Sequence, residues 1–396
     1  MELALFALAG CAFGILTGLF PGLHVNSIAL VALSLPGEKG MPLIVFIACM
    51  ATVHSFVDFV PSVLLGAPSE ESFLAVLPGH SLLLKGEGLA AIRLTVAGGL
   101  FAGIAALISG LFLALLAIKS QAMLSAIIPF ALLAIMAAMA IDERGFKKAA
   151  GLAVILLSGV LGLLALKSNL PVQNPLFCLA TGFFGASTLV DSIAKGTRLG
   201  KQRKSRFSVS GESIFGKGLI ALGAAGFVSL MPSVGASQAA FVVRKLVGKI
   251  RTRDYLLLLG GINTGTMILS FFVLFSVGKS RTGAAAAISQ LGPFGLGELL
   301  FVVAACLFAL GFAAIATDLL ASWMMGVVHL IDYRKVNLVV LCLVSCMVLW
   351  FSGPLGFCFY GIAALIGLAS LGFGVKRSNS MAFLMVPTML YYFGIV

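Results

Sequence analysis

Long apolar runs, separated by short polar segments, follow one another along the whole chain. The runs are close to the 20 residues that a helix needs to cross a bilayer. They predict five spans between Pro36 and Gly200 and five more after Arg253. The spans expected are 41–66, 94–118, 122–141, 149–166 and 172–190, then 255–277, 297–328, 337–352, 357–375 and 380–395.

Two further apolar segments, 3–35 and 218–248, each contain a break at their centre. The first holds "PGLHVNS" at 21–27 and the second "MPSVGASQ" at 231–238. One straight helix over 3–35 would be about 50 Å long, against a hydrocarbon core of about 30 Å. Backbone opened by such a break is tolerated at membrane depth only where protein or a wet cavity surrounds it. Each segment is therefore predicted to be a re-entrant hairpin.

Basic residues indicate the side from which each hairpin enters. Seven of them lie in 195–217 and five in 244–254, on either side of the second hairpin. Lys and Arg concentrate in cytoplasmic loops, so this hairpin is expected to enter from the cytoplasm. The first hairpin is flanked by only Glu2, Glu38 and Lys39 and is expected to enter from outside.

Composition agrees with a multi-pass protein of the cell membrane. Apolar residues make up 60% of the 396 residues and charged residues only 10%, whereas soluble domains carry about 25% charged residues. The net charge of +12 is concentrated at the ends of apolar segments, which argues for topology rather than nucleic-acid binding. The seven cysteines lie in apolar segments without a Cys-x-x-Cys pair and are expected to be buried, unpaired and free of metal.

The predicted elements repeat in the same order. Each half is a broken hairpin followed by five spans, and the odd number of spans inverts the second copy. Pro21 and Gly66 are 45 positions apart, and Pro232 and Gly278 are 46. We predict an all-α protein of two inverted repeats, 1–194 and 218–396, joined by a basic cytoplasmic linker at 195–217. Discontinuous helices at matching positions of inverted repeats are typical of a secondary transporter's binding site.

Several motifs resemble those of a known family. They are "GILTGLFPGLHVNSIALV", "PSVLLGAPSEESFLAVLPGHSLLLKGEGLAA" and "GLIALGAAGFVSLMPSVGASQAAF". The chain resembles the large membrane subunit of tripartite tricarboxylate transporters (TctA-like permeases), in particular a compact, stand-alone branch. It departs from the usual pattern at Ser233, where relatives carry Gly, and at "GKSRTG". The resemblance implies ion-driven transport of carboxylates, with a small membrane subunit and a periplasmic binding protein as partners.

The interruptions supply the candidate substrate-binding residues. Helix N-termini beside the breaks offer free N–H groups to an anion, although Asn26 or Ser27 could serve only as N-caps. Lys279 and Arg281 are predicted on the outside, against the charge rule, and could pair with a carboxylate or remain at the surface. The full candidate set is Pro21, Gly22, His24, Asn26, Ser27, Ser69, Ser233, Gly235, Ser237, Lys279 and Arg281.

Candidates for ion coupling lie in the spans that follow each hairpin. His54 and Asp58 are one helical turn apart near the middle of a span, where ionisable groups are costly and usually functional. They could relay protons, or form a buried hydrogen bond that positions the kink at Pro61. Asn263 and Thr264 offer neutral oxygens, which suit Na⁺ or interhelical hydrogen bonds. Na⁺ is the expected coupling ion, with H⁺ as the alternative.

Three functions remain open at this point. The first is an ion-coupled secondary transporter of a small di- or tricarboxylate-like anion, with no resident cofactor or metal. The second is a transporter or flippase of a lipid-linked phosphate, and the third an intramembrane enzyme that uses His54 and Asp58. The chain has no Walker A motif and no Ser-x-Lys or His-Glu-x-x-His signature, which argues against an ATP-driven pump and an enzyme. A homodimer is a further assembly to consider.

Overall fold

The computed structural model describes most of the chain and consists of helices throughout the described part. Described residues are 1–20, 25–34, 40–64, 73–141, 143, 145–168, 170–195, 209–230, 236–248, 250–278, 280, 282–327 and 333–395. Nine helical stretches in these ranges are long and apolar enough to cross a membrane. The expected all-α, multi-pass architecture is therefore confirmed.

The first half begins with the predicted broken segment. Helix α1 (Glu2–Leu19) ends just before the break and α2 (Val25–Ser34) begins just after it. Next come α3 (Met41–Val57), α4 (Phe59–Leu64) and α5 (Phe73–Leu84). The other helices of this half are α6 (Gly88–Ile141), α7 (Phe146–Lys167), α8 (Pro175–Ala180), the π-helix η1 (Thr181–Ala186) and α9 (Ser187–Lys195).

The second half also begins with the predicted broken segment. Helix α10 (Gly211–Leu230) ends just before the second break and α11 (Ala236–Val247) begins just after it. The others are α12 (Thr252–Val277), α13 (Gly283–Ser289), α14 (Leu296–Val327), α15 (Tyr333–Gly372), the 3-10 helix η3 (Arg377–Met381) and α16 (Ala382–Tyr392). Helix α10 begins within 195–217, so the predicted linker ends in helix. The inverted relation of the halves stays a prediction.

The structure departs from the predicted spans in two places. The expected spans 94–118 and 122–141 form one helix, α6, of 54 residues, because the polar positions Lys119–Gln121 between them contain no Gly or Pro to break it. The expected break between spans 337–352 and 357–375 is present, because α15 consists of two helical stretches that meet at a kink at Gly353 (φ 71°), before Pro354. The last helix, α16, has only 11 residues, shorter than the expected 380–395.

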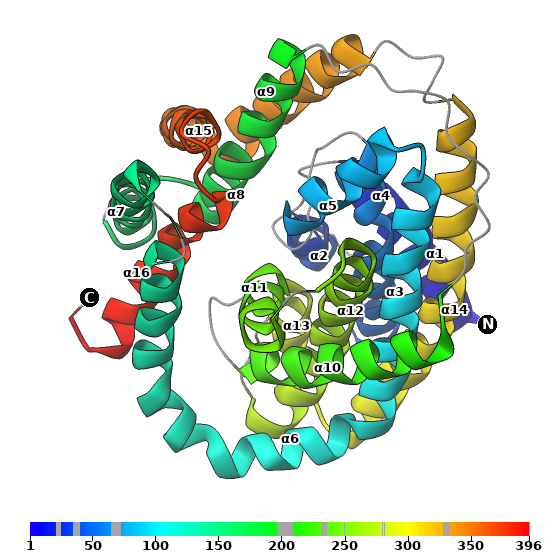
Figure 1. Ribbon diagram of the computed structural model, residues 1–396. Coiled ribbons are helices and arrows are strands. Elements are labelled where there is room, and N and C mark those ends of the chain that lie inside the picture. The colour runs from blue at the N-terminus through cyan, green and yellow to red at the C-terminus, as the bar shows by residue number, and fades with distance from the viewer. Residues whose placement is uncertain are drawn as a thin grey trace.

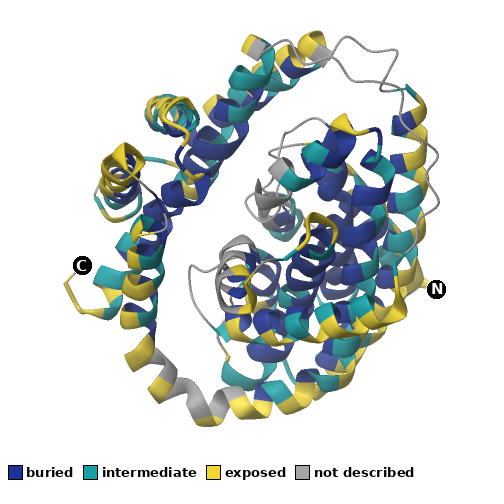
Figure 2. Cartoon of the chain, in the orientation of Figure 1, coloured by how far each residue is buried: buried dark blue, intermediate teal, exposed yellow. Residues whose placement is uncertain are grey.

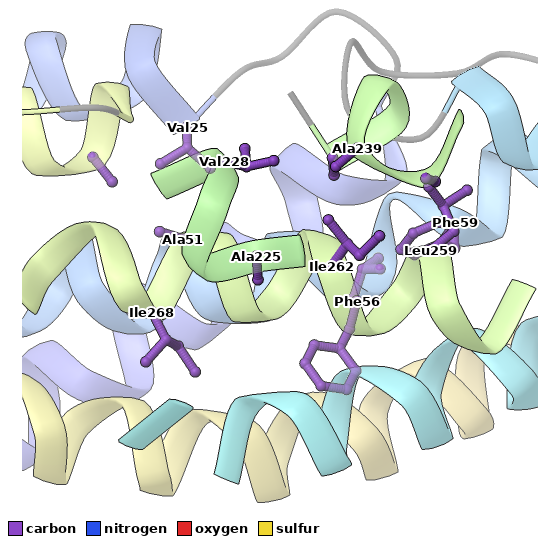
Figure 3. Packing of buried hydrophobic residues seen from close by; sticks show 14 of the residues in the cluster. Val25, Ala51, Phe56, Phe59, Ala225, Val228, Ala239, Leu259, Ile262 and Ile268 are labelled. Atoms are coloured by element: carbon purple, nitrogen blue, oxygen red, sulfur yellow. The ribbon is translucent and has the colours of Figure 1, made fainter. Parts of the chain in front are cut away.

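Two helices form the core. In the span formed by α3 and α4, all residues of the apolar 18-residue segment are buried (100%). In α12 the buried share of the corresponding segment is 89%. Helix α3 packs between α1 and α14, while α12 packs between α10 and α6. The buried faces meet at Phe56 and Phe59 from one half and Leu259 and Ile262 from the other (Figure 3). The core is thus built jointly by both halves of the chain.

Helices α7 to α9 and α15 to α16, from the ends of the two halves, form a second group (Figure 1). Helix α6 arches from the core to α7 and α16, and α15 packs on α7, α8, η1 and α9 (Figure 1). Buried residues concentrate around α3 and α12, whereas α7 and α15 are largely exposed on their outer faces (Figure 2). Such faces, in helices of this apolar character, suit contact with lipid.

The cysteines correct one expectation. All seven are free, and Cys11, Cys49, Cys178 and Cys306 are buried, but Cys342, Cys346 and Cys358 are exposed. These three lie on α15, one of the least buried of the membrane-spanning helices. The prediction of burial was wrong for these three cysteines because lipid and the protein interior are equally apolar. An apolar sequence segment therefore does not reveal which of its faces contacts lipid.

Candidate functional site

Five buried polar side chains form two hydrogen-bonded groups in the core, which adjoin at the consecutive residues His54 and Ser55 and which we together call the polar belt. Its members are Thr17 of α1, His54 and Ser55 of α3, and Asn263 and Thr264 of α12. Each is no more than 6% exposed. Three helices from two distant parts of the chain therefore bring their few polar groups to the same place, which apolar packing alone does not require.

The α3–α12 part of the polar belt joins the two halves. Asn263 Nδ2 donates to the backbone carbonyl of Ser55 at 3.1 Å. Ser55 Oγ lies 3.2 Å from Thr264 Oγ1 and donates to Thr52 O at 2.8 Å. Either hydroxyl can donate in the contact between Ser55 and Thr264.

Glycines allow the two halves to come this close. A Cβ on Gly98 of α6 would lie 1.8 Å from Leu257 O, and one on Gly260 would lie 2.2 Å from Thr95 O. Gly99, beside the polar belt, would place its Cβ 2.9 Å from Thr264 Oγ1. Backbones of α6 and α12 therefore touch directly, as small residues permit in membrane helix pairs.

The α1–α3 part of the polar belt contains His54. Its Nδ1 lies 3.1 Å from Thr17 Oγ1, and Thr17 Oγ1 donates to Gly14 O at 3.2 Å. Asp58 follows one turn later, 2% exposed, at the junction between α3 and α4. Pro61 lies in the first turn of α4, where its missing N–H requires no partner from the helix.

Three of the four predicted ion-coupling residues, His54, Asn263 and Thr264, lie in the polar belt, and Asp58 lies one helical turn after His54. His54 and Asp58 share the α3–α4 element, and Asn263 and Thr264 contact the residue after His54. The expected hydrogen bonding between helices is also present.

Most predicted substrate-binding residues lie outside the described residues. These are Pro21, Gly22, His24, Ser69, Ser233, Gly235, Lys279 and Arg281. Asn26 and Ser27 fall in the first turn of α2, and Ser237 in the first turn of α11; their side chains are likewise outside the described part. Both breaks are therefore followed directly by a helix N-terminus, as expected for an anion-binding loop.

One stretch of α12 is less buried than its surroundings. Thr266 and Met267 are partly buried, between the buried Gly265 and Ile268. They lie one turn beyond Asn263, on the same face of the helix. The hydroxyl oxygen of Thr266 is itself buried, so it adds a further polar atom to the core beside the polar belt.

Two residues of the polar belt, Thr17 and Ser55, were not predicted. Thr17 is the one polar side chain after Glu2 in α1, and Ser55 is adjacent to His54. A search for every polar residue inside an apolar segment would have found both. Their partners in space, however, depend on helix packing that the sequence does not display.

Two ion pairs also connect the halves. Their residues lie far from those of the polar belt in the sequence. Arg93 of α6 forms a bidentate pair with Asp318 of α14, with Nε–Oδ1 at 2.6 Å and Nη2–Oδ2 at 3.1 Å. Arg253 Nη2 donates to Glu87 Oε2 at 2.8 Å. Asp318 therefore has a structural role, as the ion-pair partner of Arg93.

Helices interrupted at two breaks, a core built by both halves and a buried polar belt together define a polytopic membrane protein. The chain belongs to the tripartite tricarboxylate transporter TctA family, whose model matches residues 4–382. Members of this family are membrane components of transporters and not enzymes, so the intramembrane-enzyme hypothesis is discarded.

The chain is similar over almost its full length to a curated relative. An uncharacterized protein of Methanocaldococcus jannaschii is 27% identical over 399 residues, covering 98% of this chain and 98% of that protein. No solved structure matches the chain.

Proposed function

We propose that this protein is an ion-coupled secondary transporter of a small organic anion of the di- or tricarboxylate type. The substrate binds between the two hairpin breaks, and alternating access exposes it to each side of the membrane in turn. The family supports the class of substrate, since its description names tricarboxylate. A small membrane subunit and a binding protein are the partners that fit a tripartite system.

The observation that carries the proposal is the polar belt. Ser55, Asn263 and Thr264 place neutral oxygens at the centre of the core, contributed by both halves. Burial of polar groups inside a membrane is expensive, and such groups usually mark a path for substrate or ion. Hard cations prefer oxygen ligands, so we infer that Na⁺ is the coupling ion, with H⁺ through His54 and Asp58 as the alternative.

Helix N-termini support an anionic cargo. Helices α2 and α11 begin directly after the two breaks, and the positive end of a helix dipole favours negative charge. Transporter sites elsewhere pair such half-helix N-termini with anionic substrate groups and unwound carbonyls with Na⁺. The same arrangement here would bind cargo and coupling ion next to each other.

Binding to the purified full-length protein tests the cargo. Thermal unfolding is measured with citrate-like tricarboxylates, dicarboxylates, a phosphorylated prenol and the neutral amide of a tricarboxylate, each with Na⁺ and with K⁺. We expect stabilisation by a carboxylate, greater in Na⁺, because a ligand that binds only the folded state raises its stability. Stabilisation by the phosphorylated prenol alone would instead favour the lipid-phosphate alternative and contradict the proposal.

A further inference from the structure

A basic and aromatic surface lies where α7 begins and α15 ends. It consists of five exposed side chains, which we call the corner patch: Phe146, Lys147 and Lys148 from the first turn of α7, and Phe373 and Lys376 from the turn after α15. The rings of Phe146 and Phe373 are in edge-to-face contact, with their centroids 6.3 Å apart. Two membrane-spanning helices therefore have these ends side by side at one surface of the protein.

The lysines of the corner patch lie close to this ring contact. A Cβ on Gly374 would lie 3.0 Å from Lys147 Nζ. The ammonium group of Lys147 therefore lies against the turn that carries Lys376 two residues later, and Lys148 is the next residue of α7. Positive charge from two helix ends is thus gathered beside two exposed rings.

One carboxylate offsets part of this charge. Glu143 is only 5% exposed, and its Oε1 accepts the backbone N–H of Lys376 at 2.8 Å. Asp142 and Arg144, its neighbours in the sequence, have opposite charges that cancel. Three exposed lysines against one buried carboxylate leave an excess of positive charge at the surface, which attracts anions.

The length of α7 places the corner patch at the edge of the bilayer. The helix has 22 residues, Phe146–Lys167, and is about 33 Å long, close to the hydrocarbon thickness of about 30 Å. At its other end Lys167 Nζ lies 4.6 Å from the centre of the Tyr391 ring. Lysines and aromatic rings at both ends of a span are typical of the two membrane–water interfaces.

We propose that the corner patch binds an anionic phospholipid, with the lysines on its phosphate and the two phenylalanine rings against its acyl chains. Basic residues at a membrane surface favour anionic over zwitterionic lipids. The rings of Phe146 and Phe373 are 77% and 53% exposed, and they favour a ligand with an apolar part over free phosphate. The inference goes beyond the proposed function and does not depend on its cargo or coupling ion.

Native mass spectrometry of the full-length protein measures this binding. The protein is freed of lipid in detergent and titrated with phosphatidylglycerol, or with phosphatidylcholine of the same acyl chains, and the dissociation constant of the first bound lipid is determined. We expect phosphatidylglycerol to bind at least about fivefold more tightly than phosphatidylcholine. Inorganic phosphate at an equal concentration should not displace it, and displacement would overturn the inference.

Two triple variants locate the binding. The first replaces the three lysines of the corner patch and is Lys147→Gln, Lys148→Gln and Lys376→Gln. The control removes the same charge at three separate places and is Lys85→Gln, Lys119→Gln and Lys217→Gln. We expect the first to weaken phosphatidylglycerol binding about fivefold or more and the control to stay within about twofold of wild type. An equal loss in both, or no loss in the first, would show that the corner patch is not the site.

The rings are tested separately. Phe146→Ala with Phe373→Ala keeps every lysine and should still weaken the binding of phosphatidylglycerol at least about twofold, because the acyl chains lose their contact. Unchanged binding would mean that the lysines bind the headgroup charge alone, and the combined site would be refuted. Thermal unfolding without added lipid shows whether each variant is folded, and the lysine variants keep the inference testable if the ring variant is not.

Discussion

Asn263 of the second half donates its side-chain N–H to the main-chain carbonyl of Ser55 in the first half, 3.1 Å away. A side chain that binds backbone from a different helix fixes the relative position of α3 and α12 independently of residue size. Both residues are buried at the centre of the core. The hydrogen bond therefore couples two of the three helices that carry the polar belt, α3 and α12.

Removal of this amide should impair transport more than folding. We expect Asn263→Leu, which keeps the volume, to lower uptake at least tenfold, since the Ser55 carbonyl loses its donor and the proposed Na⁺ site loses an oxygen ligand. The unfolding free energy should fall by about 1–3 kcal/mol, the cost of a buried unsatisfied polar group. Uptake in proteoliposomes and thermal unfolding measure the two effects.

A matched control exists at the other end of the molecule. Asn174 also donates its amide to a distant carbonyl, Phe351 O at 2.8 Å, but from a left-handed backbone position (φ 46°). Asn174→Gly removes the amide and tolerates that backbone. Uptake should remain within twofold of wild type; an equal loss in both variants would mean that Asn263 is merely structural.

The glycine contact between α6 and α12 predicts a steric defect. Gly260→Ala places a methyl group 2.2 Å from the Thr95 carbonyl oxygen, and the backbone there cannot move aside cheaply. We expect a loss of about 1–3 kcal/mol in the free energy of unfolding, typical of overpacking. Gly311→Ala, in α14 with no atom within 4 Å of the new Cβ, should be neutral or slightly stabilising.

The Arg93–Asp318 pair is open to a double-mutant cycle. The side chains are 31% and 39% exposed, so solvent weakens the attraction and we expect a coupling of about 0.5–1 kcal/mol. Arg93→Ala, Asp318→Ala and the double variant are compared by thermal unfolding. A coupling of several kcal/mol would mean that the pair is far less solvated than its exposure indicates.

The inverted-repeat prediction has a topological test. Single cysteines at positions 38–40 should react with an impermeant maleimide from outside the cell, and single cysteines at 195 or 211 only after the membrane is opened. The background must first lose Cys342, Cys346 and Cys358, which are exposed. Accessibility of positions 38–40 from the cytoplasm alone would refute entry of the first hairpin from outside.

Much of the architecture could be predicted because apolar length and helix-breaking residues are local signals. The ends of α1 and α10, and the starts of α2 and α11, fall beside Pro21 and Pro232 as expected. The merger of two spans into α6 could not be foreseen, since Lys119 and its neighbours are polar yet helix-compatible. The polar residues predicted a loop at this position, whereas in the structure the backbone there is helical.

The candidate site was predicted in part for a similar reason. His54, Asp58 and Asn263 are conspicuous as polar residues inside apolar helices. Their assembly with Thr17 and Ser55 depends on how α1, α3 and α12 pack, and the same apolar helices could be packed in other ways. Hydrogen-bond partners 37 and 208 residues apart are not visible in a local pattern.

The proposed ion coupling is tested most directly by uptake of a radiolabelled tricarboxylate into proteoliposomes at fixed pH and zero membrane potential. A Na⁺ gradient directed inward should drive accumulation, and replacement of Na⁺ by K⁺ should abolish it. Asn263→Leu should raise the Na⁺ concentration needed for half-maximal uptake. Uptake that is the same in K⁺, yet is lost when a proton gradient is collapsed and in His54→Ala or Asp58→Asn, would contradict Na⁺ coupling and identify the proton as the driving ion.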